Sequence, residues 1–288
     1  MRLGDEDPSG NFIDRTGRSG MGFGGGGGNM LGCLLPLVAS RFGLVGVAVL
    51  LLGYCVLTQM GGGGGLIPTG GPTTSAPSGQ STLDPNVKDV MTRVLGSTER
   101  RWSEIFQRNG LTYQPVTMVA YTDYDQSGCG AAQAAMGPFY CPTDKRIYVD
   151  PNFFNELSQR FGAPGDFAVA YVIAHEVGHH VQDLLGGLDE AHNAQVRASE
   201  AEGNAIQVKV ELQADCYAGV WAANDKNLLE PGDVEEGMRA AEAIGDDTLQ
   251  RQTQGRVVPE SFTHGTSAQR MAALRKGLET GDPAACRF

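Results

Sequence analysis

Basic residues are scarce in this 288-residue sequence: 22 lysines and arginines face 33 aspartates and glutamates, and the net charge is −11. The chain also lacks a basic stripe with interleaved aromatic residues. Proteins that bind nucleic acid use such stripes to contact phosphates and to stack on bases. The composition therefore predicts that nucleic acid is not a partner of this protein.

Charge is nearly absent from residues 31–60, where Arg41 is the one ionised side chain. The stretch 43–60 approaches the roughly 20 apolar residues that a membrane-spanning helix requires. Four arginines precede this stretch and no basic residue follows it until Lys88, so the positive-inside rule predicts a cytoplasmic N-terminus. We expect a single transmembrane anchor at 31–60 in the cell membrane, with the N-terminus cytoplasmic and the domain after the anchor extracytoplasmic. A cleaved signal peptide and a buried core helix are the alternatives.

Glycine is concentrated on both sides of the expected anchor, in the runs 24–28 and 61–65. The composition of residues 1–30 predicts a disordered cytoplasmic leader. Residues 61–82 combine glycine with proline, serine and threonine, which is typical of a flexible linker. The folded domain is therefore expected to cover residues 83–288, which is enough chain to bury a core.

The sequence contains no Cys-x-x-Cys pair, so a zinc site built on cysteines is not expected. In the part expected to face an oxidising compartment, an even number of cysteines indicates disulfides. These residues are Cys129, Cys141, Cys216 and Cys286. Three pairings are open; we favour Cys129 with Cys141, which closes a short loop, and Cys216 with Cys286, which would attach the C-terminal tail to a helix. Buried free thiols are the alternative.

Apolar periodicity and turn signals outline the expected domain. They predict strands at 116–121 and 146–149 and helices at 87–109, 152–161, 166–185 and 190–224, with two more after Gly232 and Thr266. The predicted fold class is α+β: a mostly helical domain with a small β-sheet, preceded by one N-terminal transmembrane helix.

The motif AHEVGHHVQ, residues 174–182, places His175 and His179 four positions apart, with Glu176 directly after the first. Residues four apart share one face of a helix, so the two imidazoles can bind one metal ion. Glu176 lies beside that face and can accept a proton from water, as this glutamate does in HExxH metalloproteases. A surface helix with solvated histidines is the alternative, and the small and apolar residues around the motif argue against it.

A catalytic zinc needs a third protein ligand, and the segment VELQADCYAGVW offers Glu211 and Asp215 on a second apolar helix. We predict Glu211 as that ligand. Asp215 lies one turn further on and is predicted to hydrogen-bond the outer nitrogen of a ligand histidine, which fixes its tautomer. The alternative is an acidic pair on a solvated face, which the apolar neighbours disfavour.

These two motifs, the loop GCGAAQAAMGPFYCP and the tail segments SFTHGTSAQR and GLETGDPAAC closely resemble the YpfJ-type neutral zinc metallopeptidases of bacteria. The resemblance covers nearly the whole chain and implies a gluzincin-like peptidase with a zincin-like domain and a zinc cofactor. His175, His179 and Glu211 match the ligands of that family, and Glu176 matches its base. Resemblance to other gluzincin sites implies that His264 hydrogen-bonds the developing oxyanion; a loop histidine without a catalytic role is the alternative.

The predicted function is that of a membrane-anchored zinc metallopeptidase acting on a peptide or protein substrate. The alternative is a non-catalytic, zinc-stabilised peptide-binding module or scaffold at the membrane. Glu176 separates the two, because a structural zinc site has four protein ligands and no use for a base. We further expect His180, which points away from the metal face, to be a packing residue, and a peptide to lie along the strand 146–149.

Overall fold

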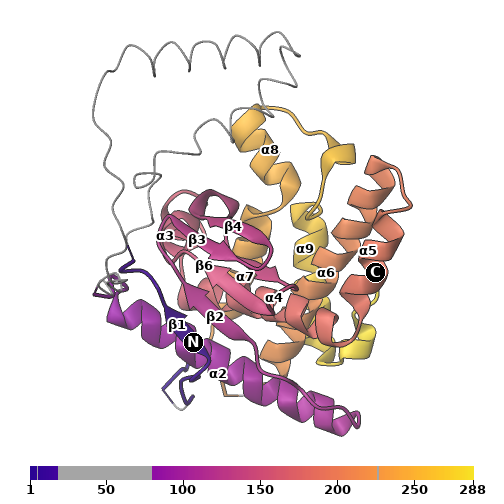
Figure 1. Ribbon diagram of the computed structural model, residues 1–288. Coiled ribbons are helices and arrows are strands. Elements are labelled where there is room, and N and C mark those ends of the chain that lie inside the picture. Colours follow the sequence, from indigo (N-terminus) through magenta and orange to yellow (C-terminus); the bar gives the residue numbers. More distant parts are fainter. Residues whose placement is uncertain (5, 19–79, 226) are drawn as a thin grey trace, which may run out of the picture. The chain divides into compact units, whose positions relative to one another are not determined.

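The computed structural model describes residues 1–4, 6–18, 80–225 and 227–288. Within these residues helices predominate and the strands are short, so the expectation of a mostly helical α+β fold with a small sheet is confirmed (Figure 1).

Four short strands form the main sheet, in the order β1 (Phe12–Asp14), β2 (Thr117–Ala120), β6 (Arg146–Val149) and β5 (Phe139–Cys141). The first three are parallel, whereas β5 is antiparallel to β6 and lies at the edge. Strands β3 (Tyr124–Ser127) and β4 (Gly130–Gln133) form a separate hairpin. The predicted strands correspond to β2 and β6. The others are three or four residues long and carry too little apolar alternation to be predicted.

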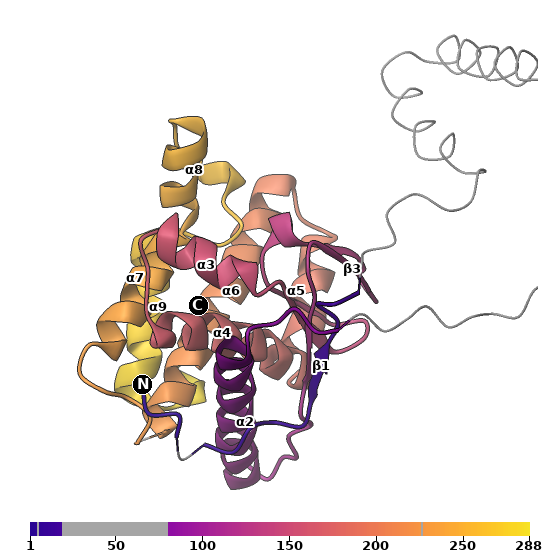
Figure 2. The same ribbon diagram turned by 90° about the vertical axis from the view of Figure 1, so that its left-hand side faces the viewer.

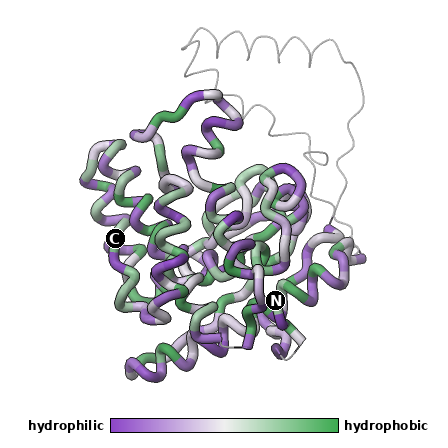
Figure 3. Tube along the Cα trace, turned by 180° about the vertical axis from the view of Figure 1, so that it is seen from behind, coloured by the Kyte–Doolittle hydropathy of each residue, from purple (hydrophilic) through white to green (hydrophobic). Residues whose placement is uncertain are grey.

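Eight helices are described: α2 (Pro85–Arg108), α3 (Asn152–Gln159), α4 (Asp166–Leu184), α5 (Gly187–Gln195), α6 (Glu200–Asn224), α7 (Asp233–Ala243), α8 (Asp246–Gln254) and α9 (Ser267–Thr280). The helix expected over 190–224 is two helices, because Ser199 forms a capping box with Glu202 and starts α6 afresh. Helix α8 was not expected; it is largely hydrophilic, as Figure 3 shows, and buries only Asp246.

Helix α4 lies at the centre of the domain and carries the HExxH motif. It packs against α2, α5, α6, α7 and the edge strand β5, and Figure 2 shows it among these helices. Its side chains are buried on nearly all sides. A helix enclosed in this way holds its side chains in defined positions, which a metal site requires.

The predicted fold class needs one correction. It included a transmembrane helix, and no helix among the described residues is long and apolar enough to span a membrane. The segment in which that helix was expected, residues 31–60, lies outside the described residues, as do residues 61–79 of the expected linker.

The expected disordered leader, residues 1–30, is not disordered in the described part, residues 1–4 and 6–18. Strand β1 pairs with β2, with Phe12 opposite Met118, and Ile13 packs on a small apolar cluster of the sheet. The composition averaged over the leader hides these few apolar residues. Two strands of one sheet lie on the same side of any membrane, so this pairing is at odds with a single crossing between them. The cellular location stays a prediction.

Candidate metal centre

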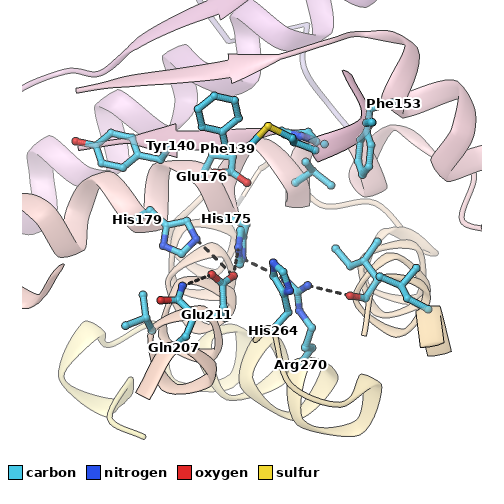
Figure 4. Close-up of a pocket in the computed structure, with 18 of the residues that line it drawn as sticks. Phe139, Tyr140, Phe153, His175, Glu176, His179, Gln207, Glu211, His264 and Arg270 are labelled. Carbon is cyan, nitrogen blue, oxygen red and sulfur yellow. Dashed lines mark hydrogen bonds and ion pairs between the residues drawn. The ribbon is translucent and has the colours of Figure 1, made fainter. Parts of the chain in front are cut away.

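His175 and His179 lie on the face of α4 that meets α6, and Glu211 of α6 lies opposite them (Figure 4). Metal-ligating atoms of these three residues all lie within 4.8 Å of one another. Glu211 Oε2 is 3.1 Å from His175 Nε2 and 3.5 Å from His179 Nε2. The structure therefore brings together the three residues that the two sequence motifs predicted as ligands.

The two helices can approach this closely because α4 has a glycine where they cross. A Cβ atom added at Gly178 would lie 2.9 Å from the backbone oxygen of Ala214 on α6. The glycine is one residue from His179, and Ala214 is three residues from Glu211. The crossing therefore sets the distance between the histidines and the carboxylate.

Asp215 accepts a hydrogen bond from His175 Nδ1 at 2.8 Å, as predicted from its spacing. It also accepts from the Tyr171 hydroxyl at 2.6 Å and from two guanidinium nitrogens of Arg270, at 2.8 and 2.9 Å. Burial would raise the pKa of Asp215, but Arg270 and His175 lower it to about 2. Asp215 thus stays ionised and directs His175 Nε2 toward Glu211.

Arg270 and Tyr171 were not predicted. Both are buried, and both hydrogen-bond Asp215 from helices other than its own. Arg270 occurs in the SFTHGTSAQR segment, but nothing in its local pattern distinguishes it from a surface arginine. A buried guanidinium needs an anion within reach, and only the packing of α9 on α6 identifies that anion as Asp215.

Glu211 is buried and ionised. Burial alone would raise its pKa, but the neighbouring imidazoles of His179 and His175 lower it well below the usual range. Its second oxygen accepts a hydrogen bond from Gln207 Nε2 at 2.8 Å. The carboxylate therefore keeps one oxygen directed at the histidines, which suits a metal ligand.

Glu176 is buried beside the three ligand candidates and lines the same pocket. Figure 4 shows its carboxylate on the α4 side of the pocket, near His175 and below Phe139. Burial raises its pKa, although the nearby His175 and His179 act in the opposite direction. A carboxyl with a raised pKa can both accept and release a proton nearer to neutral pH than an exposed glutamate.

His264 lies on the opposite wall of the pocket, and half of its side chain is exposed. Its loop is anchored by Asp246 Oδ2, which accepts the backbone N–H groups of Thr263, His264 and Gly265 at 2.7, 2.6 and 3.1 Å. The other oxygen of Asp246 lies 3.3 Å from His264 Nδ1. This arrangement leaves His264 Nε2 available to the pocket. Asp246 was not predicted, because it lies 18 residues before His264.

The pocket between these walls has a volume of about 800 Å³. Apolar side chains line much of it, among them Met136, Phe139, Phe153, Phe161 and Leu188. The strand beside the pocket is β5, at the sheet edge, whereas β6, along which a peptide was expected to lie, is paired on both sides. The strand at 146–149 is therefore not at a sheet edge, where a docked peptide would pair.

Both favoured disulfides are present, Cys129 with Cys141 and Cys216 with Cys286. The first closes the loop that forms the Met136 to Tyr140 side of the pocket, and the second attaches the C-terminal tail to α6. His180 is a buried packing residue, as expected, and hydrogen-bonds the Tyr140 hydroxyl and the Gln114 carbonyl.

The donor set fits zinc. Zinc accepts imidazole nitrogens and carboxylate oxygens, and a catalytic site supplies three protein ligands and leaves one position for water. Here two ring nitrogens and one carboxylate oxygen converge in a pocket, and each histidine has a partner at its outer nitrogen, Asp215 for His175 and Gln182 for His179.

Comparisons with known proteins agree with this geometry. A family model described as "Putative neutral zinc metallopeptidase" matches residues 1–288. "Uncharacterized protein YpfJ" of Escherichia coli K12 is 44% identical over 292 residues, which cover 99% of this chain and 98% of that protein. "Uncharacterized protein Rv2575" of Mycobacterium tuberculosis H37Rv is 48% identical over 173 residues, 56% of this chain and 57% of that protein. No solved structure matches significantly. The chain therefore belongs to the family of putative neutral zinc metallopeptidases.

Proposed function

We propose that this protein is a zinc-dependent peptidase that hydrolyses peptide bonds in peptides or proteins. The observation that carries the proposal is the convergence of His175, His179 and Glu211 beside a buried glutamate, Glu176, in one open pocket. A bound zinc ion supplies Lewis acidity, which makes water a competent nucleophile near neutral pH.

Glu176 acts as the general base. It accepts the proton of the attacking water and then delivers a proton to the departing amine. Its burial beside the ligand set supports this role, because burial raises the pKa of a carboxyl group toward neutral pH.

His264 donates a hydrogen bond from Nε2 to the oxyanion that develops on the substrate carbonyl. The support for this role is its place on the pocket wall and the orientation of its ring by Asp246. Asp246 acts through His264 and is a positioning residue.

The substrate is an extended peptide that pairs with the edge strand β5. A strand at a sheet edge has backbone N–H and C=O groups free to hydrogen-bond another chain, and this mode tolerates many side chains. The place of β5 at the sheet edge and at the pocket wall supports this docking.

The second candidate is a peptide-binding module that contains zinc for stability only. A structural zinc site closes all four positions with protein ligands. Among the described residues, three donor side chains gather at this site. The open pocket and the buried glutamate beside these donors favour the peptidase.

The test compares the zinc-loaded 288-residue chain with Glu176→Gln on a mixed peptide library. The full chain is needed because β1 belongs to the sheet. We expect Glu176→Gln to bind one zinc ion but to lose about 10²–10⁴-fold in turnover, the usual contribution of a general base. Glu279→Gln, at an exposed glutamate of α9, is the control for loss of a negative charge. Equal cleavage by the wild type and Glu176→Gln would exclude the proposed base, and zinc binding without cleavage by the wild type would favour the binding module.

A further inference from the structure

The outer nitrogen of His179 faces an amide and not a carboxylate. His179 Nδ1 lies 2.9 Å from Oε1 of Gln182, one turn further along α4. Gln182 is 2% exposed, so water does not compete for this contact. His175, in contrast, is held by the ionised Asp215. The two histidines are thus oriented by partners of different charge.

The contact continues away from the site through a second glutamine. Gln182 Nε2 donates to the Val210 carbonyl at 2.8 Å and to Gln213 Oε1 at 2.9 Å. Gln213 Nε2 in turn donates to the carbonyl oxygen of Cys286 at 2.8 Å. A chain of hydrogen bonds therefore joins His179 to the C-terminal tail.

The direction of each hydrogen bond in this relay follows from the two backbone carbonyls that the glutamines contact, those of Cys286 and Val210. A carbonyl oxygen can only accept, so Cys286 requires the amino group of Gln213 to point toward it. The amide oxygen of Gln213 then faces Gln182. The amino group of Gln182 donates one hydrogen bond to this oxygen and another to the Val210 carbonyl. Gln182 presents its own oxygen to His179, so Nδ1 of that ring must donate and Nε2 keeps its lone pair.

The C-terminal tail, at the far end of this series of hydrogen bonds, is held in place. Cys286 is fully buried and forms a disulfide with Cys216, three residues after Gln213 on α6. The Cys286 carbonyl therefore has a defined position relative to Gln213. A carbonyl on a free C-terminal segment would not keep the orientation of the amide.

We propose that Gln182, Gln213 and the Cys286 carbonyl form an amide relay that holds His179 in its metal-binding tautomer. The C-terminal tail is thereby part of the metal centre. The inference rests on the proposed function, because it takes His179 as a metal ligand. Gln182 and Gln213 are positioning residues, since neither reaches the place of the metal ion.

Removal of the Gln182 amide frees the ring of His179 to choose the other tautomer, whereas removal of the Gln213 amide leaves Gln182 oriented by the Val210 carbonyl alone. Partners of metal-binding histidines contribute about 10–100-fold to metal affinity. We expect Gln182→Met to raise the zinc dissociation constant by about that factor. Gln213→Met leaves the Val210 contact intact, so a smaller rise of about 3–10-fold is expected, scaled down from the same range.

The experiment measures the zinc dissociation constant of the full chain by competition with a chelating dye. The variants are Gln182→Met and Gln213→Met, with Asn224→Leu as the control. Asn224 also ties α6 to the C-terminal region, through the hydrogen bond from its Nδ2 to the Gly281 carbonyl, but makes no hydrogen bond to His179. A thermal melt of each metal-free variant reports its loss of stability separately.

Zinc binding that weakens in both glutamine variants but not in Asn224→Leu, at comparable losses of stability, supports the relay. A wild-type dissociation constant in both glutamine variants overturns it. Equal weakening in all three variants also overturns it, because the effect then follows general stability. Absence of zinc binding by the wild type would instead remove the proposed metal centre. The signal of His179 Nδ1–H in nuclear magnetic resonance of the zinc-loaded chain gives a second readout: the relay requires its exchange with water to accelerate in Gln213→Met.

Discussion

Asp246 shows how one carboxylate can position a pocket residue from outside the pocket. It accepts three consecutive backbone N–H groups and contacts the ring of His264. Burial would raise the pKa of Asp246, but the hydrogen bonds from His264 and its neighbours outweigh this and lower it. The group is therefore ionised throughout the neutral range.

Replacement of Asp246 by asparagine should lower the free energy of unfolding at neutral pH by about 1.5–3 kcal/mol, the usual worth of hydrogen bonds to a charged group. A folded-state pKa below the unfolded value of 3.8 means that this stabilisation is fully present above pH 3.8. It is lost as the pH falls through the folded pKa. Urea unfolding should therefore show that the wild type and Asp246→Asn differ less in free energy of unfolding at about pH 3 than at about pH 7.

The control for this measurement is Asp89→Asn, at an exposed carboxylate that pairs with Arg93. Surface ion pairs of this kind contribute little to stability, so the free energy of unfolding of Asp89→Asn should stay near that of the wild type at both pH values. If Asp246→Asn differs from the wild type by the same free energy of unfolding at both pH values, the ionised carboxylate is not the source of the stabilisation.

At the scale of elements, the site depends on the crossing of α4 and α6. The backbones approach closely because neither Gly178 nor Ala214 has a long side chain at the crossing. Glycine also allows α6 and α9 to pack closely, since a Cβ at Gly277 would collide with the Cys216 carbonyl. Helix α6 therefore meets one partner on each side, α4 with the histidines and α9 with Arg270.

We expect Gly178→Ala to lower the free energy of unfolding by about 1–3 kcal/mol, the usual result of overpacking a tight contact. It should also weaken zinc binding, because the added methyl group pushes Glu211 away from the histidines. Gly203→Ala, in the open part of α6, has nothing within 4 Å of the added atom and should stabilise by about 0.5–1 kcal/mol through helix propensity. Thermal melts and zinc titrations of both variants check this; a tolerated Gly178→Ala with wild-type zinc affinity would contradict the role of the crossing.

At the scale of the whole molecule, segments distant in the sequence are tied together by two disulfides and by the N-terminal strand. The Cys216–Cys286 bond spans 70 residues and the Cys129–Cys141 bond spans 12. Strand β1 joins the sheet next to β2, from which it is separated by about one hundred residues. The metal centre therefore lies in a domain whose N-terminal strand and C-terminal tail are both attached to the rest of the fold.

Loss of the Cys216–Cys286 disulfide, in Cys216→Ala with Cys286→Ala, should lower the free energy of unfolding by about 4 kcal/mol by the loop-entropy relation. Loss of the Cys129–Cys141 disulfide, which closes the shorter loop, should lower it by about 3 kcal/mol. Urea unfolding of the two double variants provides the comparison. The Cys216–Cys286 bond also holds the Cys286 carbonyl in place, so only its loss should weaken zinc binding. Equal zinc affinity in both double variants would show that the tail keeps its position without the bond.

The sequence alone determined the local part of this site. Residues four apart on a helix share a face, so the spacing of His175 and His179, and of Glu211 and Asp215, already indicates a ligand set with a supporting carboxylate. The boundaries of α4 and α9 follow equally from glycine and capping signals. These features depend on backbone hydrogen bonds within about one helical turn, which short stretches of sequence encode.

Beyond the ligand set and the favoured disulfides, only the tertiary structure decided which distant groups meet. Arg270 reaches Asp215 across 55 residues, Gln213 reaches Cys286 across 73, and β1 pairs with β2 from a segment whose composition indicated disorder. The membrane anchor was a prediction from apolar composition, and no helix of the described residues bears it out. Such contacts depend on how whole helices and strands bury their apolar faces against one another, and no local pattern specifies the partner.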